Sequence, residues 1–524
     1  MNIPVAVGVA LFYLAITFYL GWLGYRKTKS AADYLVAGRQ MHPYLMALAY
    51  GSTFISSSAI VGFGGMAAFM GMGLLWLNFL NIFVGIFIAF LFFGKRTRAL
   101  GHYLDAHTYP ELLGKRFNSR KIQCISGGII FLGMPLYAAA VMIGVARFLE
   151  GTLAINYEWA LLVFALVIAV YVFFGGSKGI MYTDAFQGTI MFCAMIILIF
   201  ITYKTLGGII PAHKGLTALS DKVPSAIAAM GHRGWTVMPA FNTQMWWTMV
   251  STILLGVGIG VLAQPQLAVR YMTVASNKEI NRAVGVGGLF VFMIIGVTYI
   301  VGSLSNLYFF NTSGKIAIDM VRDATGKFNI DKIIPLFLNT AMPNWFAYIF
   351  LLTLLAAAMS TLSGLFHVIG SSFGRDIFQQ LFTTKKHDKH TIDITRIGII
   401  IAFFATLALA YKLPGSIIAI VTALFYGLCA VCFLPVYFGA LFSKRMNKYH
   451  AITSMITGFT VWLFWILFIH SKNSAALGIC QMLFGKPSLA DGTVIAFVDP
   501  IVASLPVSSL VALICVVMGK KSTD

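Results

Sequence analysis

Charged residues are scarce in this chain of 524 residues, because Asp, Glu, Lys and Arg together make up only 10% of it. Soluble domains carry about 25% charged residues, so this composition excludes a water-soluble enzyme or a set of soluble domains. Hydrophobic residues instead make up 59% of the chain. We therefore predict an all-α polytopic membrane protein that crosses the bilayer many times.

Acidic residues are scarcer than basic ones, with 17 Asp and Glu against 37 Lys and Arg. The resulting net charge of +20 can indicate nucleic-acid binding. The basic residues lie in short segments beside apolar runs, however, where they encode orientation in a membrane. We therefore expect no nucleic-acid partner. Cysteine is also rare, with six residues, and the Cys429–Cys432 spacing alone is a weak signal for a metal site.

Apolar runs of membrane-spanning length predict about thirteen spans. Their centres lie near residues 14, 55, 83, 137, 166, 194, 256, 296, 358, 403, 428, 460 and 508. The start of the chain lacks the basic segment of a signal peptide, so the first span is expected to remain. Basic clusters at 26–39, 95–121, 270–282, 375–389 and 444–448 then share one side. That side is expected to be the cytoplasm, in a plasma (inner) membrane, with the N-terminus outside and the C-terminus cytoplasmic.

The second predicted span carries an interruption near its centre. Five of the seven residues from Ser52 to Ser58 have hydroxyl side chains, and three glycines follow between residues 62 and 65. Such a segment is a poor continuous helix, and backbone freed inside a bilayer is tolerated where it lines a cavity. A broken helix at a binding site is one interpretation. A close crossing of two helices through small residues is the other.

The seventh span carries a second interruption, from Gly256 to Gln266, where glycines precede Pro265 between two glutamines. It lies five spans after the first. Paired interruptions predict two inverted five-helix repeats around a site at the bilayer midplane. We expect a first flanking helix and inner loop at residues 1–42, the repeats at 43–205 and 206–442, and C-terminal flanking helices with a short tail at 443–524.

Asp184 is a rare acid within the predicted spans, near the start of the sixth. A carboxylate at that depth is costly and usually functional, although at a helix start it can instead cap backbone amides. In the ninth span, Ser360, Ser363, Gly364 and His367 share one helix face by their spacing. Hydroxyls there suit a hard cation or can bond nearby backbone. The residues alone leave both alternatives open.

Four motifs make the chain resemble the sodium:solute symporter family, from about residue 5 to residue 518. They are Ala32-Asp33-Tyr34-Leu35-Val36-Ala37-Gly38-Arg39, Gly175-Gly176 with Thr183-Asp184-Ala185-Phe186-Gln187, Gln264-Pro265-Gln266-Leu267-Ala268-Val269-Arg270, and Ala357-Ala358-Met359-Ser360-Thr361. The resemblance implies a LeuT-like 5+5 inverted repeat with flanking helices, and solute uptake driven by the sodium gradient. Sodium would be the co-transported ion, and no other cofactor is implied.

The resemblance also implies a set of ion ligands. The sodium site shared by the family would take the backbone carbonyls of Ser52, Ile55 and Ala357 and the hydroxyls of Ser360 and Thr361. Members that bind a second sodium use the counterparts of Asp184 and Ser363, which match here. Gly364 stands where a further hydroxyl is expected, so the second ion is left open.

The expected solute class follows from the same resemblance. Sugar-binding members carry a carboxylate in the third span, where this chain has Asn78, so a sugar is the weaker alternative. Several motifs, among them Ile155-Asn156-Tyr157-Glu158, are similar to the pantothenate branch. A small carboxylate such as pantothenate or a monocarboxylate is expected, with a proline-like amino acid as the alternative. The expected lining residues are Ser56, Ser57, Asn78, Asn81, Tyr137, Gln264 and Tyr426.

Two functions of other classes compete with transport. A membrane solute sensor on the same scaffold would need a signalling domain, and the sequence continues for only five residues after Gly519. An enzyme would need a nucleophile with a base, a metal or a nucleotide motif, and no convincing one is present. We therefore expect a symporter without enzymatic activity, working as a monomer in the lipid bilayer with the solute and sodium as its partners.

Overall fold

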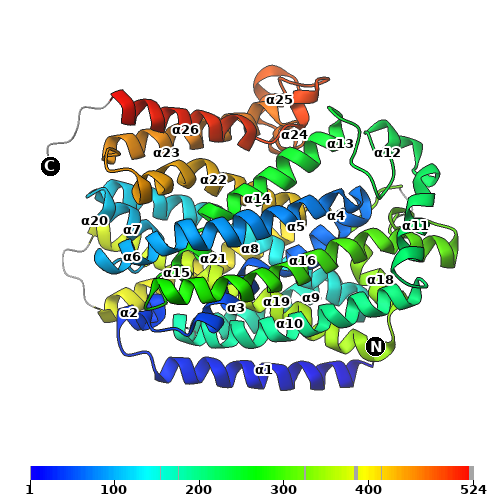
Figure 1. Cartoon of the computed structure of the whole chain (residues 1–524), viewed down its shortest axis with the longest axis horizontal. Helices are drawn as coiled ribbons and strands as arrows, with labels where there is room; N and C mark the ends of the chain where they lie inside the picture. Colours follow the sequence, from blue (N-terminus) through cyan, green and yellow to red (C-terminus); the bar gives the residue numbers. More distant parts are fainter. Residues whose placement is uncertain are drawn as a thin grey trace.

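The computed structural model describes residues 2–153, 155–174, 176–323, 326–382, 388–414 and 416–518. These residues form an elongated helical bundle, with the N-terminus at one end and the last helix, α26 (Ile501–Met518), finishing at the other (Figure 1). No β-strand occurs within those ranges, where an isolated bridge joins Arg322 to Phe328. Gly175 of the second motif, Lys385 and Lys386 of a basic cluster, and the tail at 519–524 lie outside the described residues.

Within the described part of the chain, ten helices are long and apolar enough to cross a membrane, and one bent helix pair adds an eleventh. Two shorter apolar helices, Tyr157–Ala169 and Ile501–Val517, coincide with the fifth and the last predicted spans. The other segments are Ile3–Arg26, Pro43–Met70, Met72–Tyr103, Arg120–Leu153, Ser177–Thr205, Gln244–Ala263, Asn277–Ser313, Asn344–Phe382, Thr391–Lys412, Ile418–Phe442 and Lys448–Ile469. Each predicted span centre falls inside one of these segments, so the all-α polytopic architecture is confirmed.

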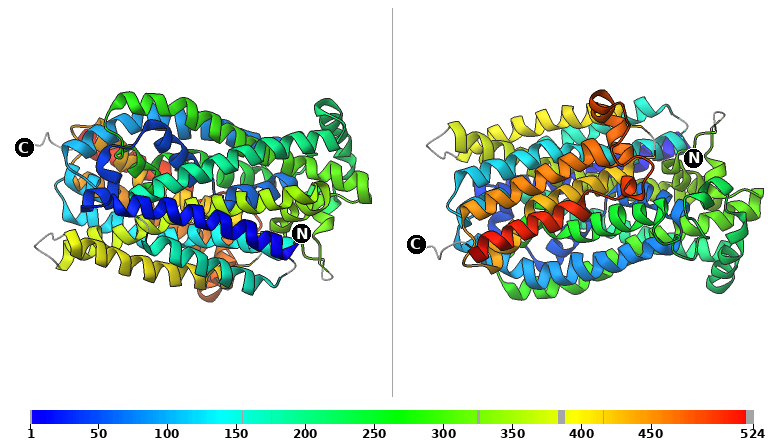
Figure 2. Two further views of the ribbon diagram at one scale, coloured as in Figure 1. Left: turned by 90° about the horizontal axis from the view of Figure 1, so that it is seen from below. Right: turned by 90° about the horizontal axis from the view of Figure 1, so that it is seen from above.

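The site is built from a small number of these helices. They are α3 (Pro43–Phe54), α4 (Phe63–Met70), α5 (Leu75–Ile82), α8 (Arg120–Leu153), α10 (Ser177–Thr205), α14 (Gly256–Gly260), α15 (Pro265–Tyr271), α16 (Asn277–Ser313), α19 (Asn344–Ser371) and α22 (Ile418–Phe442). Helix α3 packs against α10, α16 and α19, and α16 also packs against α4. Figure 2 shows the flanking helix α1 (Ile3–Arg26) on one face of the bundle and α23 (Lys448–Phe464) with α26 on the opposite face.

The second span is broken at Ile55. Helix α3 ends at Phe54, Ile55 adopts extended backbone angles of φ −96° and ψ 100°, and a π-helical turn, η2 (Ser58–Gly62), leads into α4. The two halves are bent by 54°. The glycines beyond the break allow the close helix crossing that was the alternative prediction. Helix α16 approaches Gly64 so closely that a Cβ built on Gly302 would lie 2.3 Å from the Gly64 carbonyl oxygen. This span therefore combines a broken helix with a close helix crossing.

The seventh span is also broken, and the break falls at Gln264. A 3₁₀ turn, η7 (Val261–Ala263), ends before Gln264, which has φ −73° and ψ 117°, and α15 starts at Pro265. Proline causes this geometry, because its ring disfavours a helical conformation in the residue before it while suiting the first position of a new helix. The predicted interruption is confirmed in place, but proline rather than the glycines produces it.

The two ends of the bundle differ in charge. One end, here called the basic end, holds α2 (Ala31–Val36), α6 (Lys95–Tyr103) and α7 (Tyr109–Arg116), which lie together in Figure 1. The far end holds α11 (Ile209–Ala218), α12 (Ser225–Ala229) and α18 (Ile333–Ala341). A short helix, α17 (Ala317–Met320), follows the end of α16 at Ser313.

Candidate functional site

Helix α19 lies directly against the first break. The Ser360 hydroxyl donates to the Ser52 carbonyl oxygen at 2.9 Å, and the Thr361 hydroxyl lies 3.4 Å from the same oxygen and 3.2 Å from the Thr53 carbonyl oxygen. All four residues are fully buried. Residues separated by about three hundred positions in the sequence thus form one cluster of oxygen atoms.

The two remaining residues of the predicted sodium set lie beside this cluster. Ser360 also lies 3.2 Å from the Ala357 carbonyl oxygen, one turn earlier in α19. Ile55 occupies the extended position of the break, where a carbonyl leaves the direction of the helix axis and its hydrogen-bond ladder. Backbone and hydroxyl oxygens of this kind are the ligands that a hard cation prefers. The structure therefore brings the residues of the predicted sodium set together.

Asp184 does not cap its own helix. Helix α10 begins at Ser177 with Gly176 as its N-cap, and Asp184 lies farther along, with no exposed surface. Its Oδ2 accepts a hydrogen bond from Arg270 Nη2 at 2.7 Å and another from the Thr53 hydroxyl at 3.2 Å. The Ser363 hydroxyl lies 3.5 Å from Oδ1. The predicted residues Asp184 and Ser363 thus lie side by side, and the guanidinium of Arg270 contacts the Asp184 carboxylate.

Arg270 belongs to the basic cluster at 270–282, and its pairing was not predicted. It is only 5% exposed and forms an ion pair with Asp184. A signal for this was present, because a carboxylate at membrane depth requires a partner. The partner lies on α15, directly after the second break.

Four of the predicted solute residues form a connected group. The Tyr137 hydroxyl of α8 lies 3.4 Å from the Ser56 hydroxyl in the first break. Its ring meets the ring of Tyr426 of α22 edge to face, with centroids 5.5 Å apart. Helix α14 approaches α22 so closely that a Cβ on Gly260 would lie 2.6 Å from the Tyr426 carbonyl oxygen. Gln264 follows on this segment and donates to the Gly260 carbonyl oxygen at 3.2 Å.

The other three predicted solute residues have partners elsewhere. The Ser57 hydroxyl donates to the Val141 carbonyl oxygen of α8 at 2.6 Å, and Asn78 of α5 donates to the Phe292 carbonyl oxygen of α16 at 3.4 Å. The Oδ1 atoms of Asn78 and Asn81 are buried without a hydrogen-bond partner. Buried acceptors of this kind are uncommon in proteins, so both amides retain capacity for a ligand or a water molecule.

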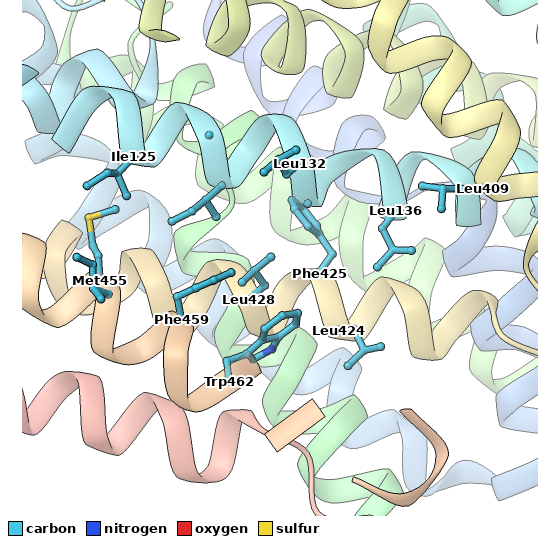
Figure 3. Close-up of a pocket in the computed structure, with 14 residues that line it drawn as sticks. Ile125, Leu132, Leu136, Leu409, Leu424, Phe425, Leu428, Met455, Phe459 and Trp462 are labelled. Atoms are coloured by element: carbon cyan, nitrogen blue, oxygen red, sulfur yellow. The ribbon is translucent and has the colours of Figure 1, made fainter. Parts of the chain in front are cut away.

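An apolar groove lies between α8, α22 and α23 (Figure 3). It has a volume of about 570 Å³, and its labelled lining includes Leu132, Phe425, Leu428 and Trp462. Leu132 is 79% exposed, although it lies in the middle of an apolar span. The groove therefore opens toward the surrounding lipid, and its aliphatic and aromatic walls do not suit a polar solute.

A second buried ion pair fixes the basic end of α19. Its continuation, the π-helical segment η9 (Ser372–Phe378), carries Arg375, whose Nε and Nη2 lie 2.7 and 3.0 Å from the two carboxylate oxygens of Glu111 on α7. Burial by itself would raise the pKa of Glu111, but hydrogen bonding to His107 and the charge of Arg375 hold this pKa well below its usual range. Glu111 is therefore ionised and holds α7 against the helix that carries Ser360.

An all-α membrane bundle with two discontinuous spans, and with a cluster of oxygens between the first break and α19, is typical of a secondary transporter. A sequence model of the sodium:solute symporter family matches residues 34–458. The chain therefore belongs to the sodium:solute symporter family, and its activity is sodium-coupled symport of a small solute.

The relatives and a solved structure agree with this assignment. The chain is 25% identical over 469 residues to the osmoregulated proline transporter OpuE of Bacillus subtilis (strain 168), which covers 89% of both chains. It is 26% identical over 461 residues to the sodium/pantothenate symporter of Haemophilus influenzae, covering 87% of this chain and 89% of that relative. A substrate-bound, outward-open structure of a sodium-coupled sialic acid symporter has a TM-score of 0.76 at 20% identity, covering 99% of this chain and 98% of that one. The fold is thus LeuT-like, as predicted.

Proposed function

We propose that this symporter carries a small solute with a carboxylate group, pantothenate or another monocarboxylate in the first place. The first break supports the proposal, because α3 ends at Phe54 beside α19 and a new helical segment begins at Ser58, packed against α8 and α22. The carbonyl end of a helix attracts a cation, and the amide end attracts an anion. A single break can therefore hold sodium and a solute carboxylate side by side.

The proposed sodium ligands are the oxygens already described. They are the carbonyls of Ser52, Ile55 and Ala357 and the hydroxyls of Ser360 and Thr361. For the solute we propose the connected group of Ser56, Tyr137, Gln264 and Tyr426, with Ser57, Asn78 and Asn81 at its margin. Asp184, the acid beside the sodium oxygens, is already paired with Arg270. It is therefore not free to bind a solute amine or a sugar hydroxyl.

Proline is the second candidate solute. Its support is that OpuE and the sodium/proline symporter 2 of Staphylococcus saprophyticus, 26% identical over 490 residues, are both named as proline transporters. The geometry of the break also suits a zwitterion, because carbonyl oxygens at the end of α3 can accept hydrogen bonds from an ammonium group. Pantothenate and proline both carry a carboxylate group. The proposed contact of this carboxylate with the amide end of the segment that begins at Ser58 is therefore the same for both.

The proposed mechanism is alternating access. Sodium and solute bind on either side of one break, so the binding of each stabilises the conformation that binds the other. An inward-moving positive charge gains about 2.3 kcal/mol per 100 mV of membrane potential. Each tenfold sodium gradient adds about 1.4 kcal/mol. One ion is therefore enough to accumulate solute substantially.

The orientation and the assembly complete the proposal. The basic end faces the cytoplasm of a plasma membrane, because Lys and Arg are retained on that side, and the far end faces outward. Each chain contains both breaks and the complete set of proposed ligands, so the transporter functions as a monomer. The division of the chain into a first flanking segment (1–42), two five-helix repeats (43–205 and 206–442) and a C-terminal flanking segment (443–524) is also part of this proposal.

Uptake of radiolabelled pantothenate and proline into proteoliposomes tests the solute assignment. We expect sodium-dependent uptake of one of them, inhibited by small carboxylates and absent when choline replaces sodium. Competition by neutral sugars alone would contradict the carboxylate class. Sodium-independent binding without uptake would favour a sensor, and chemical conversion of the solute would favour an enzyme.

A further inference from the structure

A second apolar groove lies at the basic end of the bundle, between the end of α22, the helix α26 and the segment η4 (Phe83–Gly94). Its volume is about 580 Å³. Phe438 of α22 and Leu513 of α26 line it, and these side chains are 54% and 59% exposed. Both helices are apolar segments that suit a membrane. This α22–α26 groove therefore opens toward lipid rather than toward water.

The length of the groove matches one half of a bilayer. Its lining runs along α22 from Leu434 to Ser443, the residue that follows the end of the helix. A helical stretch of this length rises about 14 Å, and half of the apolar core of a bilayer measures about 15 Å. One acyl chain of a phospholipid can therefore lie along the groove with its headgroup at the Ser443 end.

Basic side chains surround the Ser443 end of the groove. Lys444 and Arg445 follow Ser443 directly and are exposed. The guanidinium carbon of Arg96, at the start of α6, lies 4.3 Å from the centre of the Phe442 ring. Among the described residues, no carboxylate forms an ion pair with any of these three basic side chains. This end therefore carries uncompensated positive charge.

The basic rim is continuous with the apolar wall of the groove. The rings of Phe438 and Phe442 are stacked with their centroids 4.7 Å apart, and the ring of Phe93 in η4 lies 5.7 Å from that of Phe442. Arg96 lies over the same Phe442 ring. An amphiphile whose chain packs on Phe438 therefore brings its headgroup to the basic rim, where a negative charge is attracted.

We propose that the α22–α26 groove binds one phospholipid with an anionic headgroup. The acyl chain lies along Phe438, and the phosphate is bound by Arg96, Lys444 and Arg445. The headgroup supplies the negative charge that the described part of the chain does not provide at this rim. This lipid site is separate from the proposed sodium and solute sites and depends on neither of them.

The bound lipid also contacts the second broken span. Leu262 of η7 lines the groove, and η7 ends just before the break at Gln264. The acyl chain therefore packs against the helical turn that leads into this break. A phospholipid in the groove thus becomes part of the support of a discontinuous helix, on the side that faces the membrane.

Native mass spectrometry of the purified chain tests the proposal. The protein is released from detergent micelles that hold equal amounts of phosphatidylglycerol and phosphatidylcholine with the same acyl chains. We expect one phosphatidylglycerol to remain bound to each wild-type chain in preference to phosphatidylcholine. Each basic residue at a membrane surface favours an anionic lipid about fivefold, so Lys444→Gln/Arg445→Gln should lower the preference roughly 25-fold.

Matched variants separate the groove from general attraction by charge. Arg26→Gln/Lys27→Gln removes one Arg and one Lys at the end of α1, on the opposite face of the bundle (Figure 2), and should leave the preference unchanged. Ser509→Trp fills the groove from α26 and should displace both lipids. Leu132→Trp places the same side chain in the groove of Figure 3 and should displace neither.

The opposite results would overturn the lipid site. Equal retention of the two lipids by the wild type would contradict it, as would an equal loss of preference in Arg26→Gln/Lys27→Gln. Retention of phosphatidylglycerol by Ser509→Trp at the wild-type unfolding midpoint would place the lipid elsewhere. If Ser509→Trp does not fold, Leu513→Trp at an exposed position of the groove replaces it. A lipid-free wild-type dimer that Ser509→Trp separates would show that a second copy covers the groove.

Discussion

The hydroxyl oxygen of Ser360 lies 2.9 Å from the carbonyl oxygen of Ser52, and this contact joins α19 to the first broken span. Hard cations such as calcium bind oxygens at about 2.3–2.6 Å, so two oxygens at this separation can share one ion. The pair is fully buried, and neither residue carries a charge. Such an uncharged pair suits the proposed sodium ion, whose charge the carboxylate of the proposed solute can balance.

The segment Asn329–Lys332 at the far end, here called the strap, packs against α4 and the start of α22. It is expected to be held there more firmly as the pH falls. The Asp331 carboxylate of the strap accepts a hydrogen bond from the Ile417 backbone amide at the start of α22, and a Cβ on Gly65 of α4 would lie 2.2 Å from the Ile330 carbonyl oxygen. Burial raises the pKa of Asp331 from 3.8 to about 6. Protonated Asp331 therefore stabilises the packed strap fully below its ordinary pKa of 3.8, and this stabilisation is lost as the pH rises through about 6.

Between about pH 7.5 and pH 5, this linkage predicts a roughly tenfold increase in protection of the strap. This protection is measured in nanodiscs by hydrogen exchange of peptides that cover residues 328–338, after correction for the intrinsic exchange rates at each pH. The Asp331→Asn variant keeps an acceptor oxygen but does not titrate, so its protection should be independent of pH. A pH response of equal size in both proteins would assign the effect to another group.

The Glu111–Arg375 pair predicts a large loss of stability when one partner is removed. Both side chains are buried, with exposed fractions of 1% and 9%, so Glu111→Gln leaves a buried guanidinium without its carboxylate. Such losses cost about 3–5 kcal/mol. The double variant Glu111→Gln/Arg375→Gln removes both charges and should recover part of the loss, measured as the unfolding midpoint in detergent.

An exposed ion pair supplies the control for this comparison. Asp319 and Arg322 lie 3.2 Å apart with side chains 34% and 39% exposed, and pairs of this kind contribute about 0–1 kcal/mol. Asp319→Asn should therefore leave the midpoint almost unchanged. Equal losses in the single and double variants of the buried pair would show that its charges do not interact energetically.

The proposed orientation predicts opposite labelling of the two ends of the bundle. Lys121 lies exposed at the basic end and Lys214 lies exposed on α11 at the far end. In a background without the six native cysteines, Lys214→Cys should react with a membrane-impermeant maleimide in intact cells, and Lys121→Cys should react only after permeabilisation. The reverse pattern would invert the topology without affecting the fold.

Hydrophobic length and interruptions were enough to predict the fold. Apolar runs located every span, because the thickness of a bilayer fixes how long such a run must be. Ser52–Ser58 and Pro265 located both breaks, because hydroxyl clusters and proline disfavour a continuous helix through local effects. These are short-range properties, which the sequence records directly.

The pairing of distant side chains was much harder to predict. The basic character of Arg270 fitted the positive-inside pattern as well as it fitted a buried pair. Only the packing of α15 against α3 and α19, which brings Arg270 to Asp184, distinguishes the two. Thr53 was noted as a helix-disrupting hydroxyl, yet it hydrogen-bonds both members of the Asp184–Arg270 pair. Such contacts depend on helix rotation and register, which periodicity in a uniformly apolar span does not specify.

The sodium site itself gives the sharpest prediction for single hydroxyls. Thr361→Ala and Ser360→Ala each remove one oxygen from the proposed ligands, which leaves sodium with fewer partners in a buried site. Losing a hydrogen-bond-like partner of a charged group costs about 1.5–3 kcal/mol, or roughly 10- to 150-fold in affinity. The sodium concentration for half-maximal uptake should rise by that factor, measured in proteoliposomes at matched protein levels. Thr361→Ser keeps the oxygen and should change it much less. Because sodium and solute binding are coupled reciprocally, the apparent solute affinity at low sodium should fall in both alanine variants, although neither side chain is proposed to contact the solute. Wild-type sodium dependence in both variants would remove Ser360 and Thr361 from the ion site.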